Sequence, residues 1–274
     1  MKSVTENENA SGTQLLDRSV AVLKHLGEVG QAGSTSAEIA STLGLAQSTA
    51  HRIISALERH GLIERERQTK RYRLGLALFA LGATAADGTG LRRLARAALL
   101  RIASETGDTA FLMARAGFNT VCVDRQEGGY VIDSLTGHIG GQIPMGVGPA
   151  SLAVLAFLPQ AEADVIIEKN SEAYRRYENL TAEAVHASLA TIREQGYALD
   201  ECRLVAGISA LAMPILPQGR DALAAIAINM TSARLPPERI PELLALLRGE
   251  IDAIEKAINP LEPATLRTAG PFAR

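Results

Sequence analysis

The chain has 274 residues, of which 47% are apolar and 21% are charged, a composition that excludes a disordered polymer. Lys and Arg number 28 against 30 Asp and Glu, so the net charge of −2 gives no sign of a polyanionic partner for the chain as a whole. No signal peptide is evident and no apolar run approaches the ~20 residues that span a membrane, so we expect a cytoplasmic protein of about two domains with no membrane partner.

The chain begins with a polar segment and a first helix. Residues 1–13 predict a disordered tail, because a segment with so little to bury gains little from folding. A helix is predicted over residues 15–26, where apolar residues recur every three or four positions. Its predicted apolar face consists of Leu16, Val20, Leu23 and Leu26. Gly27 then ends the helix.

Two short helices joined by a tight turn follow. Thr35 and Glu38 stand three positions apart, which is the spacing of a capping box at the start of a helix. Gly44 ends this helix, and a second, amphipathic helix is predicted over residues 47–60. The side chains expected to face inward are Ala50, Ile53, Ile54 and Leu57. Two helices across a tight glycine turn predict a helix-turn-helix.

A β-hairpin is predicted directly after the second helix. Its strands are residues 62–66 and 71–74, and the polar residues 67–70 form the turn. A hairpin at this place is the wing of a winged helix-turn-helix domain, which we assign to residues 14–75. Seven cations stand against three acids between residues 46 and 75. Such a local basic stretch on a near-neutral chain is typical of a DNA-binding module.

The exposed edge of the second helix carries the predicted DNA-reading side chains. A recognition helix turns its N-terminal end to the base edges, where Gln suits adenine and Arg suits guanine. This edge consists of Gln47, Ser48, Thr49, His51 and Arg52. Lys70 and Arg71 at the wing are assigned to phosphate or the minor groove, and Arg18 of the first helix is a further candidate. Whether Arg52 contacts a base or a phosphate stays open.

The rest of the chain predicts a linker and an α+β domain. Residues 76–105 are Ala-rich and predict a helical linker with a break near residues 87–90. Residues 106–260 mix strands and helices without strict alternation, which predicts a mainly antiparallel sheet, and residues 261–274 form a C-terminal tail. The strands are predicted at residues 109–115, 120–124, 131–135, 197–200, 208–216 and 222–229, and the helices at 149–158, 161–169, 182–195 and 237–258.

These patterns resemble the IclR family of bacterial transcriptional regulators. The most specific matches lie in the DNA-binding part, at residues 15–23, 48–52 and 57–63, and looser ones continue to about residue 258. The resemblance implies a GAF-like α/β effector domain and a transcription regulator whose affinity for a double-stranded DNA operator changes when a small molecule binds. It also implies a homodimer or a dimer of dimers, and no cofactor other than the effector.

The resemblance further implies an effector pocket next to the loop at Pro144. Transferred by position, its lining consists of Ile132, Leu135, Ile143, Pro149, Ala150, Asp200, Ile208, Ala210, Ala227 and Asn229. The chain departs from the family where residues 151–153 are Ser-Leu-Ala instead of the usual Gly-Lys-Ala. Because burying a carboxylate without donors is costly, this mostly apolar lining predicts an apolar or aromatic effector. Asp200 and Asn229 are the main polar candidates, although Asp200 also fits a strand-end carboxylate that faces water.

The sequence lacks the motifs of several other chemistries. The Gly-rich residues 140–148 are not followed by the Gly-Lys-Ser/Thr of a P-loop, and no catalytic or metal-binding motif is found. We therefore expect no enzyme activity, and we expect Cys122 and Cys202 to be buried as small hydrophobic side chains. Two alternatives stay open: an enzyme or metabolite-binding protein that uses the C-terminal pocket, with the winged helix as an interaction module, and a DNA-binding protein without an effector. The effector, the operator and the sign of regulation also stay open.

Overall fold

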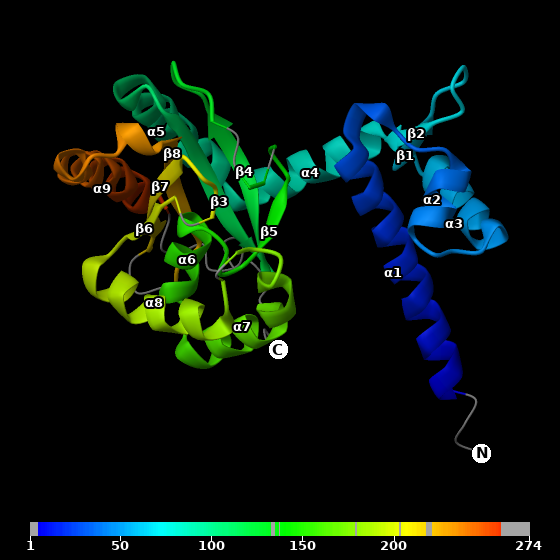
Figure 1. Ribbon diagram of the computed structural model, residues 1–274. Helices are drawn as coiled ribbons and strands as arrows, with labels where there is room; N and C mark the ends of the chain where they lie inside the picture. Colours follow the sequence, from blue (N-terminus) through cyan, green and yellow to red (C-terminus); the bar gives the residue numbers. More distant parts are fainter. Residues whose placement is uncertain are drawn as a thin grey trace. The chain divides into compact units, whose positions relative to one another are not determined.

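The chain folds into two compact units, Met1–Ala85 and Ala86–Arg274 (Figure 1). The computed structural model describes residues 5–132, 135–136, 138–178, 180–202, 204–217 and 221–258, with the backbone alone for 5–12 and 83–89. The C-terminal tail predicted at residues 261–274 therefore lies outside the described residues.

The N-terminal unit contains the predicted helices and hairpin. Its elements are α1 (Thr5–Val29), α2 (Ser36–Thr42), α3 (Gln47–Arg59), β1 (Ile63–Arg65), β2 (Tyr72–Leu74) and α4 (Leu76–Thr89). The two strands pair antiparallel, with Ile63 opposite Leu74. A small core forms where the helices and the hairpin meet, and it includes Val22, Leu26, Ile39, Ala50, Ile53, Ile54, Leu57, Ile63 and Tyr72. All four residues predicted to face inward from the second helix are thus buried.

The first helix differs from the prediction in two ways. It begins at Thr5, so most of the segment expected to be a disordered tail is helical. Its predicted apolar face is only half buried, because Leu26 is inaccessible while Leu16 is 64% exposed. The small unit packs against the C-terminal half of α1 and leaves the N-terminal half uncovered (Figure 1).

The C-terminal unit is built on one antiparallel sheet of six strands. The strand order is β5-β4-β3-β8-β7-β6. The strands are β3 (Thr109–Ala116), β4 (Asn119–Gln126), β5 (Gln142–Pro144), β6 (Ala198–Glu201), β7 (Ile208–Ile215) and β8 (Ala224–Thr231). The helices are α5 (Leu91–Thr106), α6 (Pro149–Ala156), α7 (Gln160–Tyr174), α8 (Ala182–Gln195) and α9 (Ile240–Ala257). The prediction of an α+β fold with an antiparallel sheet is confirmed.

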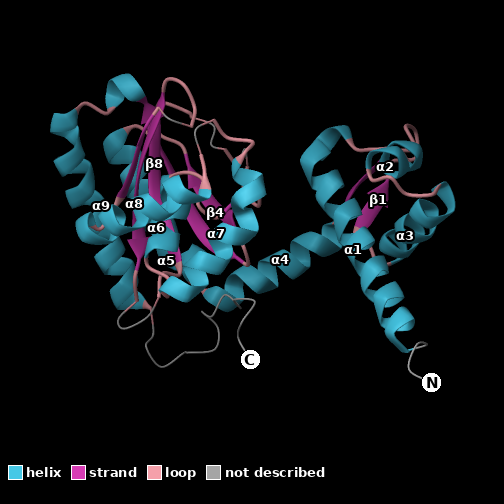
Figure 2. Ribbon diagram, turned by 60° about the horizontal axis from the view of Figure 1, so that its bottom comes forward, coloured by secondary structure: helices cyan, strands magenta, loops and turns pink. Residues whose placement is uncertain are grey.

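Helices cover both faces of this sheet (Figure 2). Side chains alternate along each strand, so Phe111 and Met113 of β3 belong to the core under α6, α7 and α8. Leu112, between them, belongs to the core under α5 and α9. All eight residues of α6 are buried, which explains why this segment is apolar all round rather than on one stripe.

A β-bulge interrupts the alternation in β4. Leu112 pairs with Asp124 and Met113 pairs with Cys122, which leaves Val123 as the extra residue. Cys122 consequently faces the core under α6, whereas Asp124 reaches Arg96 of α5 on the opposite face. The apolar pattern of this strand does not indicate the change of face.

Two further predictions are wrong. Residues 131–135 were predicted as a strand, but the described part of this segment is loop. Residues 91–105 were assigned to the linker, but α5 packs into the second core through Ala95, Leu99 and Ile102. The arginines at the start of α5 made the helix look like a solvated linker, and only the tertiary structure reveals its buried stripe.

Candidate DNA-binding and effector sites

Helix α3 presents a polar edge because its apolar residues anchor the opposite side in the core. Ile53 and Ile54 are 2% and 1% exposed. On the other side, Gln47, Ser48, His51 and Arg52 are exposed and Thr49 is half-buried. The residue types and positions of this edge are those of a recognition helix.

The two helices of the motif start differently. Thr35 accepts from the backbone N–H of Glu38 and Glu38 accepts from that of Thr35, so α2 begins with the predicted capping box. Ala46, the N-cap residue of α3, provides no side-chain cap. The first N–H groups of α3 therefore lack a side-chain cap, and such groups are suited to bind a phosphate.

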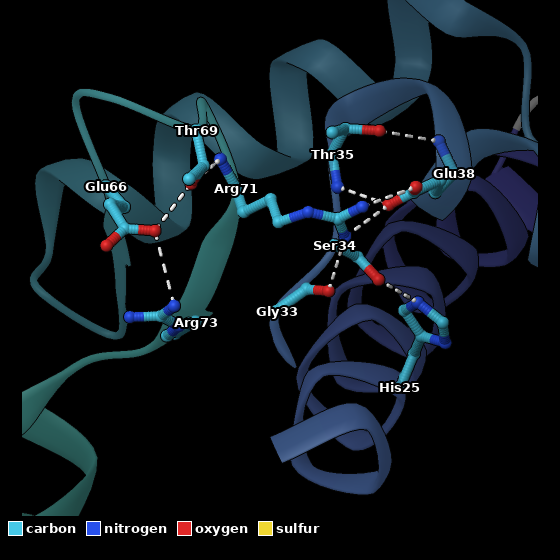
Figure 3. A network of polar contacts seen from close by, with 9 residues as sticks. All are labelled: His25, Gly33, Ser34, Thr35, Glu38, Glu66, Thr69, Arg71 and Arg73. Atoms are coloured by element: carbon cyan, nitrogen blue, oxygen red, sulfur yellow. Dashed lines mark hydrogen bonds and ion pairs between the residues drawn. The ribbon is translucent and has the colours of Figure 1, made fainter. Parts of the chain in front are cut away.

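Lys70 and Arg71 of the wing, which the sequence analysis treats together, lie in different surroundings. Lys70 is exposed at the tip of the hairpin and has a left-handed backbone with φ of 57°. Arg71, next to it, is held by the protein itself (Figure 3). Its guanidinium donates to both carboxylate oxygens of Glu38 at 3.0 Å and to the carbonyl of Gly33 at 2.9 Å. These bonds use three of the five N–H donors of the guanidinium, and the contact of Arg71 with DNA stays a prediction.

The remaining candidate, Arg18, lies on α1 and is half-buried. The sequence does not show whether α1 packs against α3, because the two helices lie far apart in the chain. In the structure both helices contribute to the small core, through Val22 and Ile53. An exposed polar helix edge, a wing tip and a neighbouring helix are thus the parts of one candidate DNA-binding unit.

The C-terminal unit contains a cavity on the α6 side of the sheet. Its empty space is about 590 Å³, part of it open to solvent. It is lined by Phe111, Met113, Leu135, Thr136, Ile143, Val147, Gly148, Pro149, Ala150, Asp200, Leu204, Val205, Ile208, Ala210, Ala227 and Asn229. Nine of the ten residues proposed from the family resemblance are in this lining, and Ile132 is not. The backbone N–H of Ile132 instead donates to Thr109.

The sequence missed several lining residues. Phe111 and Met113 lie on β3, which pairs with β8, and Phe111 is directly opposite Ala227. That register could have identified both, but it joins segments more than one hundred residues apart and cannot be read from either strand alone. Leu204 and Val205 come from the connection between β6 and β7, which has no periodic pattern.

The polar lining of the cavity is arranged in a row across three strands. Asp200 pairs with Ala210, and Ala210 pairs with Asn229. With strands about 4.8 Å apart, the α-carbons of Asp200 and Asn229 are about 10 Å apart, with only a methyl group between them. Asp200 is 7% exposed and accepts from the backbone N–H of Leu204. The alternative of a water-facing carboxylate is thus wrong, since Asp200 is buried in the cavity wall.

The loop that leads into α6 forms one wall of the cavity and is fixed from behind by α7. Asn170 donates to the carbonyls of Phe118 and Met145, and the Tyr174 hydroxyl also donates to Met145. Burial raises the pKa of Tyr174 to about 12, so it remains a donor. A Cβ at Gly146 would lie 2.4 Å from the Tyr174 oxygen, which explains the glycine.

The two cysteines differ from the expectation. Cys122 is buried, and desolvation raises its pKa to about 11. Cys202 is exposed and has a left-handed backbone with φ of 65°. Hydrogen bonds from Ser232 first, and then from Ser209, lower the pKa of Cys202. The prediction that Cys202 is buried is wrong because it sits at the strand end, where the chain turns away from the sheet.

Over the described residues, no cluster of three potential metal ligands occurs. In the same part of the chain, every helix is too short or too polar to cross a bilayer.

Comparisons with known proteins agree with this architecture. Residues 83–256 match the family model for the C-terminal region of the bacterial transcriptional regulator IclR, and residues 15–67 match the IclR helix-turn-helix domain. The chain is 26% identical to the HTH-type transcriptional regulator XynR of Escherichia coli (strain K12), over 81% of this chain and 88% of that protein. It is 29% identical to the glycerol operon regulatory protein of Streptomyces griseus, over 91% of this chain and 98% of that protein.

Solved structures show the same fold. An IclR transcriptional regulator from Alicyclobacillus acidocaldarius is 27% identical with a TM-score of 0.72, over 87% of this chain and 97% of that one. An IclR homologue from Microbacterium hydrocarbonoxydans complexed with 4-hydroxybenzoate has a TM-score of 0.70 at 20% identity, over 87% of this chain and 98% of that one. With family models that together match residues 15–67 and 83–256, the chain belongs to the IclR family of bacterial transcriptional regulators, with a helix-turn-helix DNA-binding domain and a C-terminal ligand-binding domain.

Proposed function

We propose that the exposed edge of α3 reads a double-stranded operator and that an effector in the C-terminal cavity changes the affinity for that operator. The observation that carries the proposal is the two-sidedness of α3. Ala50, Ile53, Ile54 and Leu57 are buried while Gln47, Ser48, His51 and Arg52 remain exposed. The protein would act in the cytoplasm, where bacterial DNA lies.

We assign different roles to the parts of this DNA-binding unit. Gln47, Ser48 and Arg52 have side chains that can hydrogen-bond base edges in the major groove. The open N-terminus of α3 and the ammonium of Lys70 suit phosphates, which fix position without reading sequence. Thr49, His51 and Arg18 are secondary candidates around this centre.

For the effector we propose an apolar or aromatic body. The aromatic ring of Phe111 and the flexible side chain of Met113 offer packing surface in the cavity lining. Asp200 and Asn229 of the same lining would hydrogen-bond a donor such as a hydroxyl group. The complex of a related fold with 4-hydroxybenzoate supports an aromatic ligand. We propose a regulator and not an enzyme, since its relatives are named as transcription regulators.

We propose that the protein works as a homodimer, alone or paired into a dimer of dimers. Large apolar side chains are exposed on two helices of the N-terminal unit, with Leu16 at 64% and Phe79 at 72%. Others on these helices are Leu15, Val20, Leu76 and Leu81. Exposed apolar side chains gathered on two helices mark a binding surface, and a second copy would cover them while pairing two recognition helices.

The test begins with selection of genomic fragments bound by the purified protein. Arg52→Ala should lose about fivefold or more in affinity for the selected operator, because one lost bidentate base contact is worth about 1–3 kcal/mol. Arg59→Ala is the matched control, since Arg59 is an exposed arginine at the other end of the same helix. Equal losses from both variants would contradict the assignment of the reading edge, and failure of the protein to select any fragment at low salt would contradict DNA binding itself.

A further inference from the structure

The wing is tied to the start of α2 by one arginine. Arg71 donates from one guanidinium nitrogen to Glu38 Oε2 at 3.0 Å and from the other to Glu38 Oε1 at 3.0 Å (Figure 3). It also donates to the carbonyl of Gly33 at 2.9 Å. A two-point contact between a planar guanidinium and a carboxylate fixes orientation as well as distance.

Glu38 takes part in two contacts at once. Its carboxylate accepts from the backbone N–H of Thr35 at 2.8 Å, which is half of the capping box, and from Arg71. The Thr35 bond first, and then the bond from Arg71, lower the pKa of Glu38, so it stays ionised at neutral pH. Beside it, Ser34 and Tyr72 exchange two backbone hydrogen bonds of 3.0 and 2.8 Å. The base of the wing is thus joined to the helix-turn-helix by side chain and backbone together.

Hydrogen bonds within the hairpin turn fix Lys70, the residue before Arg71. The Glu66 N–H donates to the Arg71 carbonyl at 2.8 Å, and the Lys70 N–H donates to the Glu66 carbonyl at 2.9 Å. Thr69 donates to the Glu66 carboxylate at 2.5 Å and Arg73 at 3.2 Å, which ties the turn to the strand (Figure 3). Lys70 sits inside this closed turn in a left-handed conformation that a non-glycine residue adopts only under constraint.

We propose that Glu38 and Arg71 form a clamp that positions the wing so that Lys70 reaches a DNA phosphate, and that neither residue touches the DNA. This inference rests on the proposed DNA-binding function. Arg71 would be a positioning residue, although from the sequence it looks like one more basic contact. Glu38, an acid exposed on a DNA-binding unit, would assist binding through its hold on Arg71.

For Glu38 the clamp predicts a change in DNA affinity opposite in sign to that expected from charge alone. Removal of an acid near DNA reduces repulsion, so simple electrostatics predicts that Glu38→Gln binds duplex DNA more tightly. If Glu38 is part of the clamp, the same change loosens the wing and weakens binding. Gln also serves at this position of a capping box, so Glu38→Gln keeps the start of α2 while it removes the charged partner of Arg71.

The experiment measures binding of the full chain to a random-sequence DNA duplex over a series of salt concentrations. We expect Glu38→Gln to weaken binding by about fivefold and to lower the slope of log affinity against log salt by about one, as does Lys70→Ala. In the Lys70→Ala background, Glu38→Gln should have no weakening effect, because the contact that it positions is gone. Arg71→Lys, which keeps the charge but not the two-point geometry, should behave like Glu38→Gln.

The outcomes distinguish failure of the clamp from failure of DNA binding. Tighter binding by Glu38→Gln, or full affinity in Arg71→Lys, would overturn the clamp while DNA binding stands. A full additional loss from Arg71→Gln in the Lys70→Ala background would show a direct contact of Arg71 and would also overturn it. If the wild-type chain binds no duplex at low salt, the proposed function fails and the clamp fails with it. Thermal unfolding of each variant verifies that the small unit remains folded.

Discussion

Asp124 on β4 accepts two hydrogen bonds from Arg96 on α5, at 2.8 and 3.0 Å. Asp124 is fully buried and Arg92, one turn earlier on the helix, is 3.5 Å from the same carboxylate. The bulge at Val123 turns Asp124 toward α5, and the pairing fixes the first turns of α5, which begins after Gly90. The strand next to β4 carries Phe111 and Met113 of the cavity, on the face of the sheet opposite to this ion pair.

We predict that Asp124→Asn lowers the free energy of unfolding by about 1–3 kcal/mol, because a buried carboxylate with charged donors is replaced by a neutral amide. Chemical denaturation of the full chain measures this. Asp164→Asn is the control, since its side chain is 50% exposed and contacts Gln160 and His186 at the surface, where substitutions rarely exceed 0.5 kcal/mol. Equal effects of the two substitutions would contradict a structural role of the Asp124 pair.

The cavity predicts a preference between two aromatic probes of the same size. We expect 4-hydroxybenzyl alcohol to bind at least tenfold more tightly than 4-hydroxybenzoate, because the buried Asp200 carboxylate repels a second carboxylate and accepts from a hydroxyl. Thermal shift and calorimetry measure both ligands. Asp200→Asn should reduce the difference in affinity between the two ligands. Asp221→Asn, at an exposed position outside the lining, should leave that difference unchanged. A stronger response to the acid in the wild type, or no response to either probe, would count against this orientation.

The cysteines should react in a fixed order. At about pH 8, iodoacetamide should label Cys202 and leave Cys122 unmodified in the folded chain, since the thiolate is the reactive form. The pKa of Cys122 is raised to about 11 by burial, while hydrogen bonds from Ser232 and Ser209 lower that of Cys202. Peptide mass spectrometry distinguishes the two sites, and unfolded protein, in which both should react, serves as the control. Labelling of Cys122 first would contradict the described burial.

The exposed apolar residues of α1 and α4 predict how the protein associates. Leu16→Glu and Phe79→Glu should each shift the protein toward monomers in sedimentation at micromolar concentration, because a charge in an apolar interface is costly to bury. Lys24→Glu is the matched control, as it adds an acid to an exposed position on the same helix α1. If all three variants keep the wild-type mass, these surfaces do not join two copies.

Local patterns predicted the N-terminal unit well, because its signals lie within a few residues of one another. The capping box of Thr35 and Glu38 and the buried face of α3 are both present as expected. The pairing of Arg71 with Glu38 was not predicted, since a cation looks the same in sequence whether it faces solvent or an acid thirty-three positions away. Its role depends on how the hairpin folds back, which no window of the sequence contains.

The cavity lining was likewise predicted only in part, because some of its residues are brought together by strand pairing. Positions transferred from the family, such as Ala210 and Ala227, line it as proposed. Phe111 and Met113 were missed because they become neighbours of those positions only through the pairing of β3 with β8. The bulge at Val123 was also out of reach, since one extra residue changes the face of Asp124 without changing the apolar pattern.

The absence of a side-chain cap at Ala46 has a consequence for the free protein. The first amide groups of α3 have no side-chain cap, so their hydrogen exchange should be faster than that of the capped start of α2. An operator would slow this exchange by completing the helix end. Inorganic phosphate should compete with DNA more strongly than chloride at equal ionic strength. The first turn of α3 would then become fully ordered only when DNA is bound.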